Sequence, residues 1–261
     1  MRPLLSPLTQ DRSGPIHYDR VTASPDPRPI VLFFPAYDEE STVGSVIARS
    51  PKHVCGYRVK IVVVDDGSTD STAAVATRAG ADVVVLRRHL GLGAAVRIGL
   101  RHAVLTHDPI AVAFADADGE YAPEELARLI EPIVAGEADY VIGSRFQGEI
   151  GRMLPSRRFG NHALTIALRA IARTPISDGQ SGYRALSASA AAHAEIIHDY
   201  NYAQVLTLDL LAKGFRYGEV PISYSFRTRG SSFVRPFEYL SKVVPAVVRQ
   251  IRAPISTRVI R

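Results

Sequence analysis

The chain lacks the features of several common protein classes. Cys55 is the only cysteine among 261 residues, which excludes an intramolecular disulfide and a cysteine-rich zinc site and favours a reducing compartment. The best candidate for a membrane-spanning helix, residues 161–172, is short and carries Arg169. The first fifteen residues include an early proline and no apolar run of the kind found in signal peptides. We therefore expect a cytoplasmic protein, or one held peripherally at the inner face of the membrane.

Several catalytic and binding motifs are also missing. The chain has neither a GxSxG nucleophile elbow nor a Walker loop. The segment GLGAAV departs from a dinucleotide-binding loop, because Val96 stands where a small residue is needed. Two histidine pairs are five residues apart, the wrong spacing for one helical face, and we interpret them as surface residues and not zinc ligands: His102 with His107, and His193 with His198. No nucleic-acid-binding motif is present, so we expect no nucleic-acid partner.

The composition is that of a globular protein with a full core. Hydrophobic residues make up 46% of the chain, and the formal net charge is +5, from 31 basic and 26 acidic residues. This modest positive charge fits a phosphate-bearing substrate or an anionic membrane surface. Residues 1–28 are rich in Pro, Ser, Asp and Arg without periodicity, which predicts a mobile tail.

Apolar runs alternate with helical patterns from residue 30 onward. We predict buried strands over residues 30–36, 59–66, 81–86, 109–116 and 138–144, with a late strand over 219–226 placed at the sheet edge by Pro221. We predict helices over residues 41–50, from Ser68 or Thr69 to Ala79, and over 92–105, 155–172 and 201–213. Continuous apolar strands alternating with helices indicate an α/β fold: a mostly parallel central sheet with helices on both faces.

Acidic pairs follow two of the predicted strands. Asp65 and Asp66 end one strand, while Asp116 and Asp118 end another. Ligands of such sheets bind beyond the carboxyl ends of the strands, so these side chains are expected to line one crevice.

The segment FADADGEYAPEEL places its acids two residues apart. In an extended segment, Asp116 and Asp118 would point to the same side, and a divalent cation would remove their repulsion. Oxygen ligands suit Mg²⁺ or Mn²⁺. The alternative is that both are loop or capping residues paired with a local arginine. Similarly, VVVDDGSTD is either a ribose-binding strand end or an ordinary turn with a helix cap.

Seven motifs in order resemble one enzyme family. They are FPAYDEESTVGSVI, IVVVDDGSTDST, HLGLGAAVRIGL, FADADGEYAPEEL, VIGSRF, DGQSGYRALS and EVPISYSFRTRGSS. Together they resemble the family 2 glycosyltransferases of the GT-A (nucleotide-diphospho-sugar transferase) fold, and most of all the branch of dolichyl-phosphate mannose synthases and related polyprenyl-phosphate glycosyltransferases. The resemblance covers residues 29–232, which we take as the catalytic domain.

The resemblance implies a donor site and a metal site. It implies that the nucleotide base and ribose are held by Pro35, Ala36, Tyr37 and Glu39, with a further contact from Asp65 or Asp66. It implies a DxD pair, Asp116 and Asp118, on the metal and the diphosphate, with Glu120 near the metal where relatives often have Gln.

The resemblance also implies where the phosphates and the acceptor bind. The residues near the phosphates would be Arg145 of the GSR segment and Arg227, Gly230 and Ser232 of the RxxGxS segment. The DxxSGxR segment beside the acceptor would supply Asp178, Ser181, Gly182 and Arg184. Three positions depart from the family pattern: His89 (usually Asn), Leu92 (often Lys) and Ser231–Ser232 (usually Ser–Lys).

The implied activity is an inverting, metal-dependent transfer of a hexose from GDP-mannose or a UDP-sugar to a polyprenyl phosphate. A phosphate acceptor needs positively charged groups and no general base. The arginines that would supply this charge are Arg145, Arg157, Arg158, Arg184, Arg227 and Arg229. With a soluble hydroxyl acceptor, Asp178 would be the base. A third reading is a nucleotide-sugar-binding protein without catalysis.

The last part of the chain, residues 233–261, is basic and amphipathic. Apolar pairs at helical spacing predict a helix over 237–252, kinked at Pro245. This helix either lies on an anionic membrane, packs on the domain or forms a homodimer contact.

Overall fold

The structure is a computed structural model and describes residues 26–200, 202–225 and 245–250. Most of the predicted tail, the segment holding Arg227, Arg229, Gly230 and Ser232, and most of the predicted C-terminal helix lie outside the described residues.

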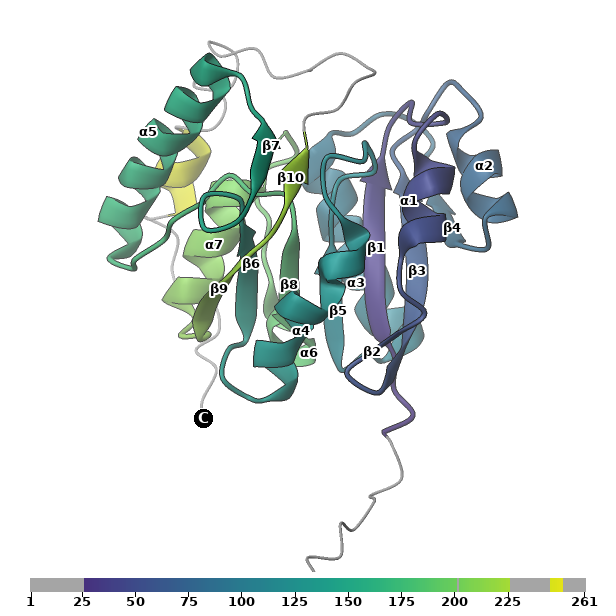
Figure 1. The fold of residues 1–261 in the computed structure, drawn as a ribbon, viewed down its shortest axis with the longest axis horizontal. Coiled ribbons are helices and arrows are strands. Elements are labelled where there is room, and N and C mark those ends of the chain that lie inside the picture. The colour runs from purple at the N-terminus through teal and green to yellow at the C-terminus, as the bar shows by residue number, and fades with distance from the viewer. Residues whose placement is uncertain (1–25, 201, 226–244, 251–261) are drawn as a thin grey trace, which may run out of the picture.

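An eight-stranded sheet forms the centre of the molecule (Figure 1). Its strands run in the order β2-β3-β1-β5-β8-β6-β9, with β4 also paired to β3. The bounds are β1 Ile30–Ala36, β2 His53–Val54, β3 Tyr57–Asp65, β4 Asp82–Val85, β5 Ala111–Phe114, β6 Tyr140–Ser144, β8 Arg184–Ser187 and β9 Tyr217–Pro221. All pairings are parallel except those of β8 with β5 and β6 and of β2 with β3. The mostly parallel sheet is confirmed.

Helices cover both faces of this sheet, as predicted (Figure 1). Alternate residues of β1 point to opposite sides: Ile30 and Leu32 belong to one core cluster, and Val31 and Phe33 to the other. The bounds are α1 Val43–Arg49, α2 Thr72–Arg78, α3 Leu92–His107, η1 Pro123–Glu125, α4 Leu126–Val134, α5 Pro155–Ala172, α6 Ala188–His193 and α7 Ala203–Ala212. Residues of α1 and α4 pack in the first cluster, and residues of α3, α6 and α7 in the second.

Two local predictions were wrong. Helix α2 has Ser71 at its N-cap position, because Ser68 is bonded to Asp65 and Thr69 to Asp38 instead. The strand predicted over 219–226 is interrupted after Pro221: β9 ends there, at the edge of the sheet as expected, and the chain re-forms a short strand, β10 (Tyr224–Ser225).

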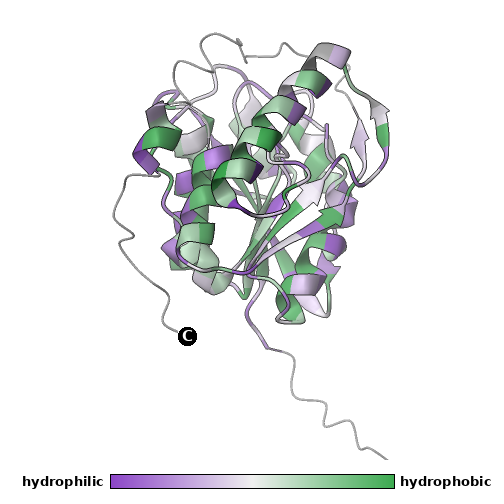
Figure 2. Cartoon of the chain, turned by 90° about the vertical axis from the view of Figure 1, so that its left-hand side faces the viewer, coloured by the Kyte–Doolittle hydropathy of each residue, from purple (hydrophilic) through white to green (hydrophobic). Residues whose placement is uncertain are grey.

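A two-stranded sheet of β10 and β7 (Ile150–Arg152) lies beside the main sheet and leads into α5. Hydrophobic and hydrophilic residues alternate along α5, which crosses the face seen in Figure 2. Phe159 is 78% exposed and Ile166 is 62% exposed, while Leu168 packs in a small cluster below the helix. Among the described residues, none of the helices combines the length and the apolar character that crossing a bilayer requires.

Six described residues represent the predicted C-terminal helix. Residues 245–250 are helical. Ala246 is buried in a core cluster, and Val247 packs against the cluster of Leu168. This part of the segment therefore packs on the domain.

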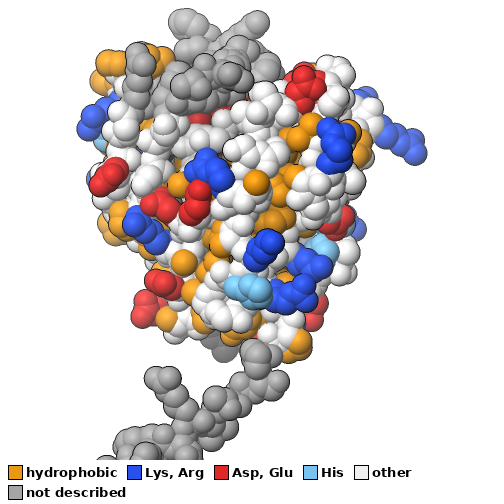
Figure 3. Space-filling view, turned by 45° about the vertical axis from the view of Figure 1, so that its right-hand side comes forward, with side chains coloured by type: hydrophobic (Ala, Val, Ile, Leu, Met, Phe, Trp, Pro, Cys, Tyr) orange, Lys and Arg blue, Asp and Glu red, His pale blue; other side chains and the backbone are white. Residues whose placement is uncertain are grey.

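Charged side chains of both signs are scattered among hydrophobic ones on the face that includes the β4 edge (Figure 3).

Candidate active site

The carboxyl ends of the parallel strands bring the candidate residues together. Asp65 ends β3, Ala36 ends β1, and the segment after β5 carries Asp116. The backbone N–H of Asp66 donates to the carbonyl of Ala36 at 2.8 Å, so the first two strand ends are joined directly. The acidic side chains predicted to share one edge of the sheet do so.

The segment after β5 is a turn and not an extended strand. The chain leaves β5 at Phe114, turns at Asp118 and passes through Gly119 at a φ of 77°. We had predicted that Asp116 and Asp118 point to the same side because the segment is extended. The segment is not extended, so that reason was wrong. An Asp118 carboxylate oxygen accepts the backbone N–H of Glu120 at 3.0 Å, which is the bond that shapes this turn.

Asp116 lies where a negative charge is costly. Burial, followed by the charges of Glu120 and Glu39, raises the pKa of Asp116 to about 6, against an opposing effect of Arg145. Glu39 comes from the loop after β1. Carboxylates from two strand ends therefore act on the same carboxyl group.

Gly182 packs directly on Asp116. A Cβ atom at this glycine would stand 2.5 Å from Oδ2 of Asp116 and 3.1 Å from the Tyr121 ring. The Gly182 N–H also donates to the Tyr121 hydroxyl at 2.7 Å. The DxxSGxR segment is thus held against the DxD turn, and only glycine fits at the contact.

Glu120 is buried at 6% exposure and accepts the Tyr224 hydroxyl at 2.8 Å. Its backbone carbonyl accepts the N–H of Ser225 at 3.0 Å. β10 therefore fixes the far side of the DxD turn. A cavity of about 520 Å³ adjoins this contact, with Gly119, Glu120, Tyr121 and Tyr224 among its lining residues.

Arg145 and Asp178 form a buried ion pair behind the turn. Nε of Arg145 lies 2.7 Å from Oδ2 of Asp178, and Nη2 lies 2.8 Å from Oδ1. Asp178 has no exposed surface. In this arrangement both oxygens of the Asp178 carboxylate accept hydrogen bonds from Arg145. The ion pair would have to open before Asp178 could take a proton from an acceptor.

Arg184 is also enclosed, with no exposed surface. Its guanidinium donates to the carbonyls of Ser181, Gly179 and Ala203, to Thr207 and to the Tyr140 hydroxyl. Ser181 is equally buried. The prediction that these two side chains contact an acceptor does not fit this geometry, because they lie inside the protein and hold the 178–184 loop together.

The loops after β1 and β3 are bonded to each other. The Thr69 N–H donates to an Asp38 carboxylate oxygen at 2.7 Å, and the Glu39 N–H donates to Thr72 at 2.8 Å. Pro35 and Ala36 are buried strand residues, so their side chains offer a ligand little exposed surface. Tyr37 is half-buried and its ring lies 4.1 Å from that of His89, centre to centre.

Asp65 and Asp66 are buried but serve different partners. Asp65 accepts the N–H of Ser68 at 3.1 Å, as the turn interpretation predicted. Asp66 accepts the backbone N–H groups of Leu90 and Gly91, each at 2.8 Å, and contacts His89 at 2.9 Å. Asp66 therefore organises the segment before α3, a role that the sequence did not reveal.

Two of the predicted acceptor arginines lie in α5. Arg158 is exposed on the first turns of α5, and Arg157 lies beside it in the same helix. Two residues with evident roles escaped the sequence analysis, namely Tyr121 and Tyr224. Both carry hydroxyls that bond the DxD turn to its surroundings. Both lie within the seven motifs, but the resemblance assigned no role to either.

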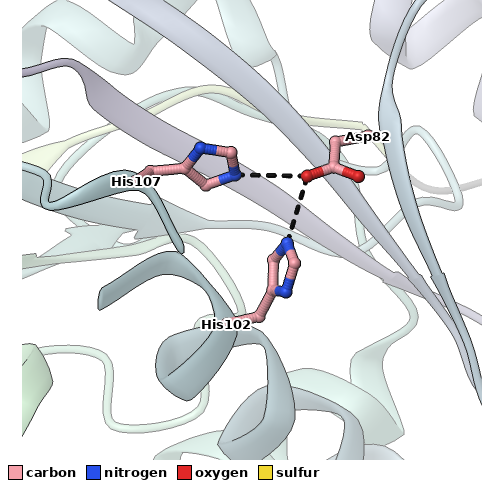
Figure 4. A group of neighbouring side chains, drawn as sticks. All are labelled: Asp82, His102 and His107. Carbon is pink, nitrogen blue, oxygen red and sulfur yellow. Dashed lines mark hydrogen bonds and ion pairs between the residues drawn. The ribbon is translucent and has the colours of Figure 1, made fainter. Parts of the chain in front are cut away.

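The spacing argument about one histidine pair was wrong, because five residues of separation do not keep the two rings apart. His102 and His107 are half-buried, and the nitrogens of both rings contact the carboxylate of Asp82 (Figure 4). Within the described residues, these are the only three His, Cys, Asp or Glu side chains whose candidate ligand atoms all lie within 4.8 Å of one another. The carboxylates of Asp116, Asp118 and Glu120 do not converge to that extent.

Solved structures place this fold in a known class. Glucosyl-3-phosphoglycerate synthase from Mycobacterium tuberculosis, solved with Mn²⁺, uridine-diphosphate and phosphoglyceric acid, superposes with a TM-score of 0.67 at 23% identity, covering 88% of this chain and 80% of that one. The likeness is one of fold. The chain therefore has the GT-A fold.

Sequence relatives identify the family. The model of glycosyl transferase family 2 matches residues 32–193. A polyprenol monophosphomannose synthase of Mycolicibacterium smegmatis is 36% identical over 82% of this chain and 83% of its own length. A UDP-N-acetylglucosamine–dolichyl-phosphate N-acetylglucosaminyltransferase of Methanococcus voltae is 31% identical over 74% of this chain and 84% of its own length. This chain belongs to glycosyltransferase family 2 and is a glycosyltransferase.

Proposed function

We propose that the enzyme moves a sugar from a nucleotide-diphosphate sugar to a polyprenyl phosphate with the help of Mn²⁺ or Mg²⁺. The observation that carries this proposal is the environment of Asp116, a half-buried residue packed against Gly182, whose pKa is raised to about 6 by desolvation and by the charges of Glu120 and Glu39. Such a cluster is relieved when a cation binds, and an anionic diphosphate then completes the site.

Asp116 and Asp118 are the proposed cation ligands, with Glu120 completing the acidic environment from its bond to Tyr224. All three offer oxygen atoms only, which suits Mg²⁺ and Mn²⁺. The bound cation would neutralise charge on the departing diphosphate. Asp118 lies in the turn after β5, where its carboxylate also accepts the backbone N–H of Glu120.

The nucleoside is proposed to lie over the loops after β1 and β3. Tyr37 offers a ring, Glu39 and Asp65 offer carboxylates, and the chain at Pro35 and Ala36 offers backbone groups. Asp66 acts indirectly, by holding the segment at His89 and Gly91 beside this pocket. Cross-bonds between the two loops prepare the pocket before the donor binds.

A phosphate acceptor suits the chemistry of the site. A phosphate monoester has a second pKa of about 6 and is largely dianionic at neutral pH, so it attacks without a general base. Arg145 lies near Asp116 but shares its charge with Asp178, whereas the exposed Arg158 offers a surface position on α5 for a phosphate. Arg157, Arg227, Arg229 and Ser232 stay proposed contacts of the phosphates.

The lipid part of the acceptor is proposed to approach α5. Phe159 and Ile166, seven residues apart, expose most of their apolar surface on one side of the helix. An exposed apolar stripe next to basic residues is typical of a peripheral membrane surface. The two relatives named above, a polyprenol monophosphomannose synthase and a dolichyl-phosphate N-acetylglucosaminyltransferase, support the same acceptor class.

A soluble acceptor is the second candidate. The structural neighbour that binds phosphoglyceric acid favours it. In this alternative Asp178 would serve as base, but its closed ion pair with Arg145 and its complete burial argue against that role. The two candidates share the donor and differ only in what attacks the sugar.

The donor is tested by melting the protein with GDP-, UDP- and dTDP-sugars in the presence of Mn²⁺. A ligand that binds the native state raises the melting temperature, by an amount equivalent to about 2.7 kcal/mol at a hundred times Kd. We expect one nucleotide to stand out, and the shift to vanish in Asp118→Asn. Asp108→Asn is the matched control, since Asn tolerates the left-handed conformation of that residue.

The acceptor is tested with the donor found in this way. Polyprenyl phosphate and 3-phosphoglycerate are supplied separately, and the glycosylated products are identified by mass spectrometry. Formation of a polyprenyl-phosphate sugar supports the proposal. Transfer to 3-phosphoglycerate alone would establish the second candidate. Failure of every nucleotide sugar to bind in manganese buffer would overturn the proposed donor chemistry itself.

A further inference from the structure

Asp82, His102 and His107 form a compact cluster away from the crevice (Figure 4). Asp82 is the first residue of β4, and both histidines belong to the last turns of α3. Nε2 of His102 lies 3.1 Å from Oδ2 of Asp82, and Nε2 of His107 lies 3.2 Å from the same oxygen. We propose that these three side chains bind a divalent cation of intermediate softness, with Zn²⁺ as the best fit.

The spacing of the donor atoms matches the size of such an ion. With bonds of about 2.0–2.1 Å, two ligands of a tetrahedral Zn²⁺ stand about 3.3 Å apart. The two nitrogen-to-oxygen distances in this cluster are close to that value. Two imidazoles and one carboxylate leave a coordination position for water, and this donor set favours Zn²⁺ over Mg²⁺.

The surroundings support a cation. Nδ1 of His102 lies 3.4 Å from the Thr106 hydroxyl, so the second nitrogen of this ring has a polar neighbour, as is usual for metal-binding histidines. His107 is the last residue of α3, where the helix dipole and the final carbonyl groups favour positive charge.

The cluster is distinct from the crevice. Strand β4 runs parallel to β3, with Asp82 opposite Val62 and Val85 opposite Asp65. Asp82 therefore lies at the amino end of its strand, while the crevice lies at the carboxyl ends. Helix α3 begins at Leu92 near the crevice and ends at His107 beside Asp82. A cation here would clamp the edge strand β4 to the end of α3.

Hydrogen bonds alone could produce the same distances. Each imidazole could donate an N–H to the shared oxygen, and no cation would then be bound. Replacing Asp82 with Asn separates the two explanations. Asn keeps an acceptor oxygen for the imidazoles but removes the anionic ligand.

The test is a Zn²⁺ titration of the full chain, purified without a histidine tag and followed by calorimetry. The background variant is Asp116→Asn/Asp118→Asn, which removes the crevice as a competing site. We expect this protein to bind a single Zn²⁺, and binding to weaken at least about tenfold when His107→Gln or Asp82→Asn is added, since even partners of metal ligands are typically worth 10–100-fold. His53→Gln, on an exposed residue of β2, is the matched control and should bind normally.

A second readout covers variants that lose stability. Zn²⁺ should raise the melting temperature of the background protein and of His53→Gln but not of Asp82→Asn. Co²⁺ in place of Zn²⁺ should give the visible absorption of a four-coordinate site with nitrogen and oxygen ligands. Absence of Zn²⁺ binding, or binding that is equally strong in His107→Gln and Asp82→Asn, would overturn the proposal.

Discussion

Arg145 and Asp178 are joined by two parallel hydrogen bonds of 2.7 and 2.8 Å, and both side chains are almost fully enclosed. The backbone N–H of Arg145 adds a third bond to the same carboxylate at 3.1 Å. Arg145 directly follows β6, and Asp178 opens the loop that leads to β8. The pair therefore fixes this loop, which in turn carries Gly182 against Asp116.

Replacing Asp178 with Asn should destabilise the protein strongly. The change leaves the Arg145 charge buried without a counter-charge, and the free energy of unfolding should fall by about 3–5 kcal/mol. Urea unfolding measures this. The control is Glu124→Gln, which breaks the solvent-exposed pair with Arg49 and should cost at most about 1 kcal/mol. Equal losses in the two variants would contradict the structural role of the buried pair. Activity of Asp178→Asn must accordingly be compared at temperatures where the variant is folded.

Replacing Gly182 with Ala should reduce nucleotide binding in the crevice more than it reduces the stability of the fold. The added methyl would stand 2.5 Å from Oδ2 of Asp116, so the carboxylate must move. We expect a loss of about 1–3 kcal/mol in stability from overpacking and a clear loss of Mn²⁺-dependent nucleotide binding. Calorimetry with Mn²⁺ and the chosen nucleotide measures the second effect. Gly160→Ala on α5 is the control, because its added methyl meets no atom within 4 Å. Unchanged nucleotide affinity in Gly182→Ala would show that Asp116 does not hold the cation.

The contribution of Asp116 to the stability of the metal-free protein should fall as the pH rises. Burial and neighbouring acids raise the pKa of Asp116 from its ordinary value of 3.8 to about 6 in the folded state. The folded state therefore binds this proton more tightly than the unfolded chain, so the contribution of Asp116 to the free energy of unfolding declines from about pH 4 to about pH 6 and remains low above that range. Asp116→Asn should remove this decline and stabilise the metal-free protein at neutral pH. Urea unfolding in a chelator across this range tests it, and an Asn variant less stable than the parent at neutral pH would refute the assignment.

Replacing the exposed apolar residues of α5 should weaken binding to lipid and leave the affinity for the nucleotide donor unchanged. Phe159→Ser and Ile166→Ser change exposed side chains, so stability should stay within about 0.5 kcal/mol. We expect weaker sedimentation with anionic vesicles and slower transfer to long-chain polyprenyl phosphate, with unchanged nucleotide affinity. Leu105→Ser is the matched control, since Leu105 is 72% exposed on α3. If the control and the α5 variants bind vesicles equally, α5 is not the lipid-facing surface.

Much of the fold was evident in the sequence because it depends on local pattern. The apolar runs of β1 and β3 are continuous, and such runs between helical segments require a covered parallel sheet. The limits of α5 were predicted correctly, since a proline opens the helix and the periodicity holds to Ala172. The short antiparallel strand β8 was missed, because RALS has neither length nor alternation to mark it. Its strand character comes from the neighbours β5 and β6 that it bonds.

The sequence by itself determined that acidic side chains would gather at the carboxyl ends of the strands, because strand direction and residue order fix which ends share an edge. Only the tertiary structure decided what each of them does. Asp178 pairs with Arg145, which is more than thirty residues away in the chain, and Asp66 binds the segment at Gly91. Asp82 contacts two histidines whose spacing in the sequence did not predict that they would lie together. Contacts of this kind depend on how distant segments pack, and packing is set by the whole core and not by any local pattern.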